Sequence, residues 1–150
     1  MASINDVVIK IATVNGTGSA SANSLLRKAV FRMGVPVVGK NYFPSNIQGL
    51  PTWYEIRITG DGYCCRSDRV DIMVAMNAQT YAKDLAEVEP GGCLIYDSTW
   101  PRSSLLNPDD ILIIGVPLSR MCNERFDTAR ARILMKNIAY VGVIAALLDV

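Results

Sequence analysis

Short apolar stretches alternate with amphipathic ones along this chain. Residues 7–14 are nearly continuously apolar and rich in β-branched side chains, which is typical of a strand buried on both faces. The same pattern in shorter form predicts an apolar strand over residues 71–76 and buried strands over residues 93–96 and 111–116. Residues 35–38 are expected to form a second short strand. Strands of this kind belong to a parallel sheet that helices cover on both sides.

Residues 53–59 show a different pattern. Tyr54, Ile56 and Ile58 alternate with polar neighbours, which predicts a strand with one buried face and one wet face. The Asp61-Gly62 turn signal follows, so we expect residues 63–65 to return as the second strand of an antiparallel hairpin.

Three amphipathic stretches predict helices over residues 21–33, 78–88 and 129–148. Gly34 ends the first, and Asn77 is a candidate N-cap for the second. Strands that alternate with helices predict an α/β fold with right-handed crossovers. We therefore expect an open, mainly parallel, Rossmann-like sheet flanked by helices, with an antiparallel edge hairpin.

Composition narrows the possible functions. Half of the 150 residues are hydrophobic and 19% are charged, which excludes a disordered chain, and a net charge of +1 argues against a nucleic-acid partner. The chain has no histidine, so it cannot build a Ser-His-Asp triad or a histidine metal site alone. The apolar run 138–150 is too short to span a bilayer, so no membrane partner is expected.

The four cysteines, Cys64, Cys65, Cys93 and Cys122, contain no C-x-x-C spacing for a metal or cluster. The first ten residues lack the features of a signal peptide. We expect reduced thiols in a cytoplasmic protein, with burial in the fold as their main role.

A glycine turn, Gly16-Thr17-Gly18, separates the first strand from the first helix, where an α/β sheet offers amide groups to an anion. Ser21 stands where the dinucleotide fingerprint has its third glycine, so the match to an NAD site is weak. No Gly-Lys-Ser/Thr follows the glycines, so the turn is not a P-loop. Residues 7–54 contain no acid but five cations, which gives this part a positive local charge. The turn serves either close packing or partner contact, or it binds an anion.

Three other segments have competing interpretations. The loop 41–53 combines aromatic side chains, amides and two prolines, which suits either a recognition surface or packing on its own domain. Asp97 follows a strand on the usual ligand side, where it is either catalytic or, as we favour, the acceptor of an Asx turn. The charged set near the C-terminus is expected to form a salt-bridged helix face, with anion binding as the alternative; it comprises Arg120, Glu124, Arg125, Asp127, Arg130 and Arg132.

Taken in order, several of these segments resemble one family. They are residues 14–23, residues 42–54, Val74-Ala75-Met76-Asn77, Pro90-Gly91-Gly92, and Lys136-Asn137-Ile138 with Gly142. The sequence resembles the gamma domain of the 2-oxoacid:ferredoxin oxidoreductases, which is often fused ahead of the alpha subunit. Its glycine turn departs from the family's Gly-rich run, and Asn46 and Gln48 stand where many members carry charge. These departures point to a subgroup such as the 2-oxoglutarate-type enzymes.

The resemblance implies a complex that converts a 2-oxoacid such as 2-oxoglutarate reversibly to acyl-CoA and CO₂. Thiamine diphosphate with Mg²⁺ would sit between the alpha and beta parts. Electrons would leave through a [4Fe–4S] cluster, held outside the gamma domain, to ferredoxin. The implied assembly is a dimer of heteromers.

For this chain the resemblance implies a single gamma-type domain over residues 1–150, the N-terminal piece of a longer chain. It would bind no cofactor or metal alone, hold no catalytic residue, and serve in assembly and in shaping the cleft. In that role the domain would contact coenzyme A or another anion through Gly16, Thr17, Gly18, Ser19, Asn46 and Gln48. A stand-alone nucleotide- or anion-binding module and a ligand-free interaction domain are the alternatives.

Overall fold

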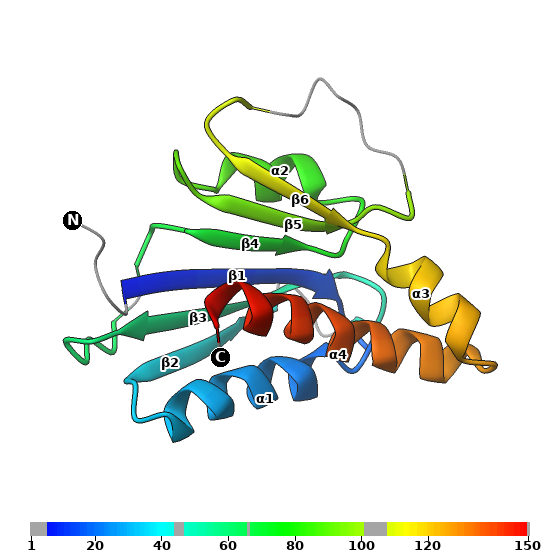
Figure 1. The fold of residues 1–150 in the computed structure, drawn as a ribbon, viewed down its shortest axis with the longest axis horizontal. Coiled ribbons are helices and arrows are strands. Elements are labelled where there is room, and N and C mark those ends of the chain that lie inside the picture. Colours follow the sequence, from blue (N-terminus) through cyan, green and yellow to red (C-terminus); the bar gives the residue numbers. More distant parts are fainter. Residues whose placement is uncertain (1–5, 44–46, 66, 101–107, 150) are drawn as a thin grey trace.

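The computed structural model describes residues 6–43, 47–65, 67–100 and 108–149. Within them, six strands form one sheet in the order β2-β3-β1-β4-β5-β6 (Figure 1). The strands are Asp6–Val14 (β1), Val37–Tyr42 (β2), Pro51–Thr59 (β3), Ile72–Ala75 (β4), Cys93–Asp97 (β5) and Leu112–Val116 (β6). Strands β1, β4, β5 and β6 run parallel, as the apolar stretches predict.

The antiparallel part of the sheet differs from the expected hairpin. Strand β3 pairs antiparallel with β1 along its whole length and with β2 on its other side, and residues 63–65 form no strand. Gly62 does form a turn, at φ +74° with its N–H bonded to the carbonyl of Thr59 at 3.2 Å. Because both hydrogen-bonding edges of β3 are already occupied, a strand returning from this turn has no edge to pair with.

The prediction that one face of β3 is exposed to solvent is also wrong. Glu55 is only 6% exposed and Thr59 only 2%. On this face Trp53 donates a hydrogen bond from Nε1 to Asp84 Oδ1 at 2.8 Å, and Asp84 belongs to the helix on that side of the sheet. Alternation correctly separated the two faces of the strand, but a layer on each side buries both.

Four helices flank the sheet in the described part of the chain: Ser19–Arg32 (α1), Tyr81–Ala86 (α2), Leu118–Arg125 (α3) and Ala129–Leu148 (α4). Helices α1 and α4 cover one face, and their apolar side chains join those of β1, β3 and β4 in the main core (Figure 1). Helix α2 packs on the opposite face over β4 and β5. The fold is therefore the three-layer α/β arrangement that the element order predicts.

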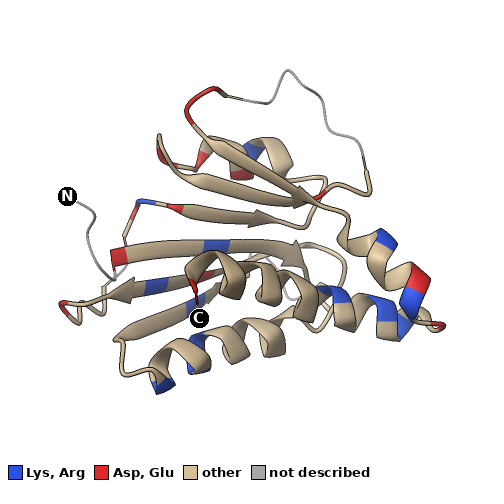
Figure 2. Ribbon diagram, viewed as in Figure 1, with Lys and Arg blue, Asp and Glu red and all other residues tan. Residues whose placement is uncertain are grey.

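Helix α2 begins later than expected and α3 was not foreseen. Asn77 does not cap α2 but accepts a hydrogen bond from the N–H of Gln79 in the turn before it, at 3.0 Å. The expected salt-bridged face is divided, because Arg120 and Arg125 lie on α3 while Arg130 and Arg132 lie on α4. No ion pair found among the described residues joins these arginines to Glu124 or Asp127. Lys and Arg nevertheless gather on α3 and the first half of α4 (Figure 2).

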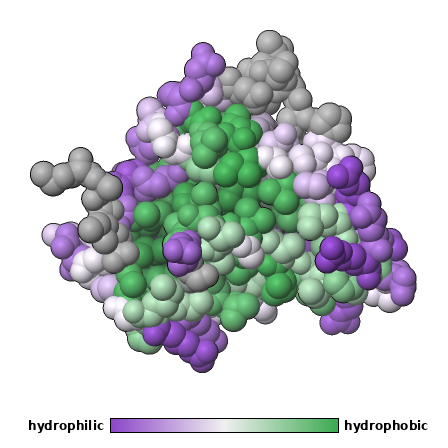
Figure 3. All heavy atoms as spheres, in the orientation of Figure 1, coloured by the Kyte–Doolittle hydropathy of each residue, from purple (hydrophilic) through white to green (hydrophobic). Residues whose placement is uncertain are grey.

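Helix α4 has the predicted bounds and is apolar on more than its packed side. Tyr140, Val141 and Ile144 are buried, whereas Ile133 and Ile138 are each 43% exposed. The face of the molecule that carries α1 and α4 is widely apolar (Figure 3). By length and composition alone α4 could cross a membrane, although the core helix of a soluble protein meets the same criteria. The expectation of no membrane partner stays a prediction.

Candidate functional site

The glycine turn connects β1 to α1 at the carboxyl end of the parallel strands. Gly16 and Gly18 have φ angles of +87° and +79°, which side chains other than glycine rarely adopt. Thr17 closes the turn by donating a hydrogen bond from its hydroxyl to the carbonyl of Val14 at 2.8 Å. Helix α1 starts at Ser19 without a side-chain cap and without an acidic residue in its first turn. Its N-terminal amide groups therefore favour an electron-rich ligand.

Side chains of helix α4 hold the glycine turn and the first part of α1 in place. Asn137 Nδ2 donates a hydrogen bond to the carbonyl of Thr17 at 2.8 Å, and Asn137 is only 4% exposed. Tyr140 donates its hydroxyl to Asn23 Oδ1 at 2.8 Å, and burial raises the pKa of this tyrosine far above its ordinary value. Two polar contacts across more than 100 residues of sequence thus hold the turn and the first part of α1 in place.

We expect Tyr140→Phe to lower the free energy of unfolding by about 2 kcal/mol, because the Asn23 oxygen would be left buried without its donor. Tyr63→Phe is the control, since Tyr63 is 57% exposed and its change should stay below about 0.5 kcal/mol. Urea denaturation followed by circular dichroism measures both. Equal losses in the two variants would show that the buried bond contributes nothing.

The segment before β3 folds against the glycine turn. Asn15 donates its N–H to the carbonyl of Leu50 at 2.8 Å and accepts from the N–H of Gly49 at 3.0 Å. A Cβ on Gly16 would lie 2.5 Å from Cγ of Gln48, so the absent side chain makes room for Gln48. The glycine turn and the segment before β3, which the sequence marked separately, therefore form one structural unit.

A cavity of about 250 Å³ opens beside this unit, between α1 and the antiparallel strands. Its lining combines small, uncharged polar and aromatic residues and contains no charged side chain. The residues are Thr13, Asn15, Gly16, Gly18, Ser19, Ala20, Asn23, Asn41, Phe43, Thr52, Trp53 and Tyr54. Uncharged donors at a helix N-terminus can hold a phosphate, a carboxylate or an amide without a paired counter-charge.

Only some of the site residues predicted from the sequence line this cavity. Gly16, Gly18 and Ser19 line the cavity, whereas Thr17 faces away from it and closes the turn. Gln48 touches Gly16 but does not line the cavity, and Asn46 lies outside the described residues. Asn41 and Thr52 line it and belong to the loop 41–53, a candidate recognition surface. Asn23 also lines it and was not anticipated, because an isolated polar residue in a helix carries no local signal of a ligand.

Asp97 is engaged in holding its own loop. Its Oδ1 accepts a hydrogen bond from the N–H of Thr99 at 3.1 Å, which is the predicted Asx turn, and its Oδ2 accepts from the N–H of Ser119 at 3.1 Å. Burial opposes ionisation of Asp97, but the bonds from Ser119 and Thr99 outweigh it and lower the pKa of the carboxyl. The carboxylate thus caps the start of α3.

The cysteines divide into two classes, and all four are free thiols. Cys93 and Cys122 are buried, as expected, and burial raises the pKa of both thiols. Cys64 and Cys65 are exposed, so the expectation of burial is wrong for them. Among the described residues, no three His, Cys, Asp or Glu side chains converge to hold a metal.

Comparison with known proteins finds similarity to parts of oxidoreductases. A family model described as "Pyruvate ferredoxin/flavodoxin oxidoreductase" matches residues 8–150. The alpha subunit of 2-oxoacid:ferredoxin oxidoreductase 2 from Aeropyrum pernix is 28% identical over 123 residues, which make up 82% of this chain and 19% of that protein.

Solved structures share the fold. A 2-oxoglutarate:ferredoxin oxidoreductase from Magnetococcus marinus, with 2-oxoglutarate, coenzyme A and succinyl-CoA bound, superposes with a TM-score of 0.83 at 24% identity, over 96% of this chain and 24% of that one. The gamma subunit of a keto/oxoacid ferredoxin oxidoreductase from Geobacter sulfurreducens superposes with a TM-score of 0.72 at 19% identity, over 95% of this chain and 78% of that one. The chain thus spans 19% of the curated relative and 24% of the Magnetococcus chain.

Proposed function

The chain belongs to the pyruvate ferredoxin/flavodoxin oxidoreductase family, and from that premise we propose that it works as the gamma-type part of a 2-oxoacid:ferredoxin oxidoreductase. The complex would oxidise a 2-oxoacid to acyl-CoA and CO₂ and pass the electrons to ferredoxin. The observation that carries the proposal is the family match over residues 8–150, on a fold shared with a gamma subunit. The ligands named with the Magnetococcus structure favour 2-oxoglutarate as the substrate.

The side chains of this domain favour a role in assembly and in shaping the cleft rather than in the chemical step. The sequence has no histidine, and the buried carboxylates Asp84 and Asp97 are both held by hydrogen bonds within the fold. The described residues do not fit an iron–sulfur cluster, because no group of cysteines converges. In this proposal alpha and beta partners in the cytoplasm supply thiamine diphosphate, Mg²⁺ and the [4Fe–4S] cluster.

The cavity at the start of α1 is proposed to hold part of coenzyme A. The uncapped helix N-terminus favours a phosphate group, and Asn41 offers both a donor and an acceptor to the amides of the pantetheine arm. The Oδ1 of Asn23 accepts from Tyr140, so Asn23 offers only its amide N–H groups. A space of about 250 Å³ is smaller than typical pockets for drug-sized ligands, so the rest of the molecule would extend over a partner subunit.

The function is tested on the protein purified together with its associated subunits. Reduction of ferredoxin should require a 2-oxoacid and coenzyme A, and the highest rate is expected with 2-oxoglutarate. No reduction with any 2-oxoacid would contradict the proposed function. Tight binding of a dinucleotide to the chain without partners would instead support the stand-alone nucleotide-binding module.

The contact with coenzyme A is tested by Asn41→Asp, which adds a negative charge to the cavity while changing its shape little. We expect the KM for coenzyme A to rise about tenfold, which corresponds to 1.4 kcal/mol, with the KM for the 2-oxoacid unchanged. Asn123→Asp is the matched control, because Asn123 is exposed on α3 and its substitution changes the net charge by the same amount. The same KM for coenzyme A in both variants would refute the contact and leave the family activity intact.

A further inference from the structure

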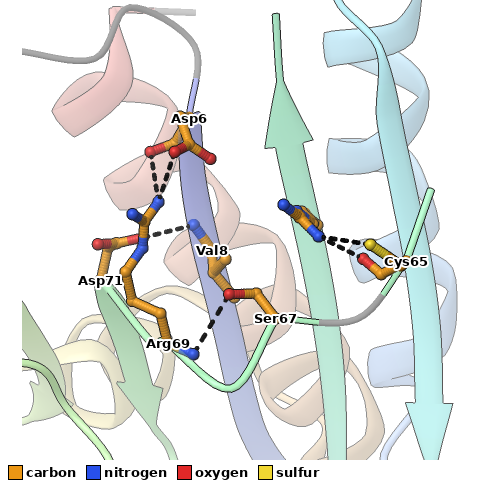
Figure 4. Close-up of polar contacts among 7 residues, drawn as sticks. Asp6, Val8, Cys65, Ser67, Arg69 and Asp71 are labelled. Carbon is orange, nitrogen blue, oxygen red and sulfur yellow. Dashed lines mark hydrogen bonds and ion pairs between the residues drawn. The ribbon is translucent and has the colours of Figure 1, made fainter. Parts of the chain in front are cut away.

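Two adjacent cysteines lie in the turn that follows β3. Both are exposed, and their thiols have different partners. Cys64 Sγ lies 3.5 Å from the carbonyl oxygen of Gly62, to which it donates. Cys65 Sγ lies 3.2 Å from Nη1 of Arg57, and the same nitrogen donates to the Cys65 carbonyl at 2.7 Å (Figure 4). The cation is therefore directed to one sulfur of the pair.

Arg57 is itself held in place. It extends from β3, and its guanidinium lies 5.8 Å from the centre of the Tyr63 ring, within the range of a cation–π contact. With the bond to the Cys65 carbonyl, this fixes the guanidinium on the turn. The thiolate is the attacking form in thiol–disulfide exchange, and negative charge spreads over the reacting sulfurs in the transition state. A donor that is already positioned at the sulfur stabilises that charge.

A cavity of about 120 Å³ adjoins the pair. It is lined by Val38, Lys40, Tyr42, Glu55, Arg57, Cys64 and Cys65. Lys40 and Arg57 contribute two positive charges, against one negative charge from Glu55, which is 6% exposed and has its own partner. The excess positive charge favours an anionic group, and the volume, about that of four water molecules, suits one carboxylate of a larger molecule rather than the whole of it.

We propose that Cys65 is a site of reversible mixed-disulfide formation with an anionic low-molecular-weight disulfide such as glutathione disulfide. The Cys65 thiolate attacks one sulfur of the small disulfide, whose S–S bond breaks as the new S–S bond to Cys65 forms. The second half of the small molecule leaves with the electron pair as a thiolate and takes a proton from water. Cys65 is oxidised, that half is reduced, and an excess of free thiol reverses the step.

The other three cysteines are poorer sites. Cys64 has a carbonyl rather than a cation at its sulfur, and Cys93 and Cys122 are buried. A disulfide between Cys64 and Cys65 would be strained, because neighbouring residues seldom reach the geometry that an S–S bond needs. Exchange with a small molecule is therefore favoured over closure of the pair.

The test treats the anaerobically purified protein, with any associated subunits, with glutathione disulfide and with neutral hydroxyethyl disulfide. Fragment mass spectrometry should locate the first adduct at Cys65, and dithiothreitol should remove it. Cys64→Ser should keep the adduct and Cys65→Ser should abolish it. Adducts at equal rates on Cys64 and Cys65, or a first adduct on Cys93 or Cys122, would overturn the proposal.

Two charge variants separate the roles of the cations. Arg57→Gln should slow exchange with both disulfides about tenfold, since it removes the donor at the sulfur. Lys40→Gln should slow only the reaction with glutathione disulfide, and Lys40 is exposed, so this variant should keep the fold. An unchanged rate for Arg57→Gln, or an equal effect of Lys40→Gln on both disulfides, would count against the site.

Discussion

Gly92→Ala is expected to lower the free energy of unfolding by about 3 kcal/mol, because a new methyl group would meet backbone that cannot move aside. A Cβ at this position would lie 2.8 Å from the carbonyl oxygens of Asp71 and Glu89. Both oxygens accept hydrogen bonds here, from the N–H groups of Cys93 and Gly92 at 2.8 Å. Relief of the clash would therefore separate β5 from the segment that leads into β4.

Gly91→Ala is the matched control for this prediction. Gly91 has φ +82° and open space around the position of a Cβ, so its replacement adds only backbone strain, about 1 kcal/mol. Urea denaturation of both variants gives the two losses. A loss for Gly92→Ala no greater than that for Gly91→Ala would show that the chain relaxes around the methyl group.

Asp84→Ala is expected to destabilise the fold by about 3 kcal/mol, since it leaves a buried donor without its acceptor and opens a cavity. Asp84 is fully buried and accepts from Trp53 Nε1 at 2.8 Å and from the Thr80 hydroxyl at 2.6 Å. Asp84→Asn keeps an oxygen for Trp53. The Thr80 hydroxyl can then donate to the Asn77 carbonyl, which is 3.4 Å away, so this variant should change stability little at acid pH.

The pH dependence of the stability of the wild type and of Asp84→Asn is a sharper test. Burial raises the pKa of the Asp84 carboxyl, although the hydrogen bonds from Thr80 and Trp53 act in the opposite direction. The stability that a raised pKa contributes is fully present below the unfolded value of about 3.9 and is lost as the pH rises through the folded value. The side-chain amide of Asp84→Asn does not titrate. The stability of this variant should therefore rise relative to that of the wild type as the pH increases through the folded pKa of Asp84. A difference that stays constant with pH would contradict the raised pKa.

Local signals predicted the parts of the fold that depend on local chemistry. The apolar run of β1, the amphipathic pattern of α4 and the glycines at positive φ each follow from a few neighbouring residues. The sequence also marked Gly16, Gly18 and Ser19, which line the cavity, because a turn between a strand and a helix is recognisable from its residues alone.

The remaining site residues depend on contacts between distant segments. Asn23 and Asn41 reach the cavity only because α1 packs over the part of the sheet that β2 and β3 form, and Asn137 reaches Thr17 across 120 residues. No pattern within a short window carries this information.

Apart from helix α3 and the strand expected over residues 63–65, the order of strands and helices, the parallel core of the sheet and the glycine turn were determined by the sequence itself, since periodicity and glycine conformation act over a few residues. The tertiary structure decided which strands flank β3, why Glu55 is buried, and how the segment before β3 joins the turn to form a cavity. Those outcomes depend on which edges and faces are already occupied when distant segments pack, and this is a property of the whole chain rather than of any one segment.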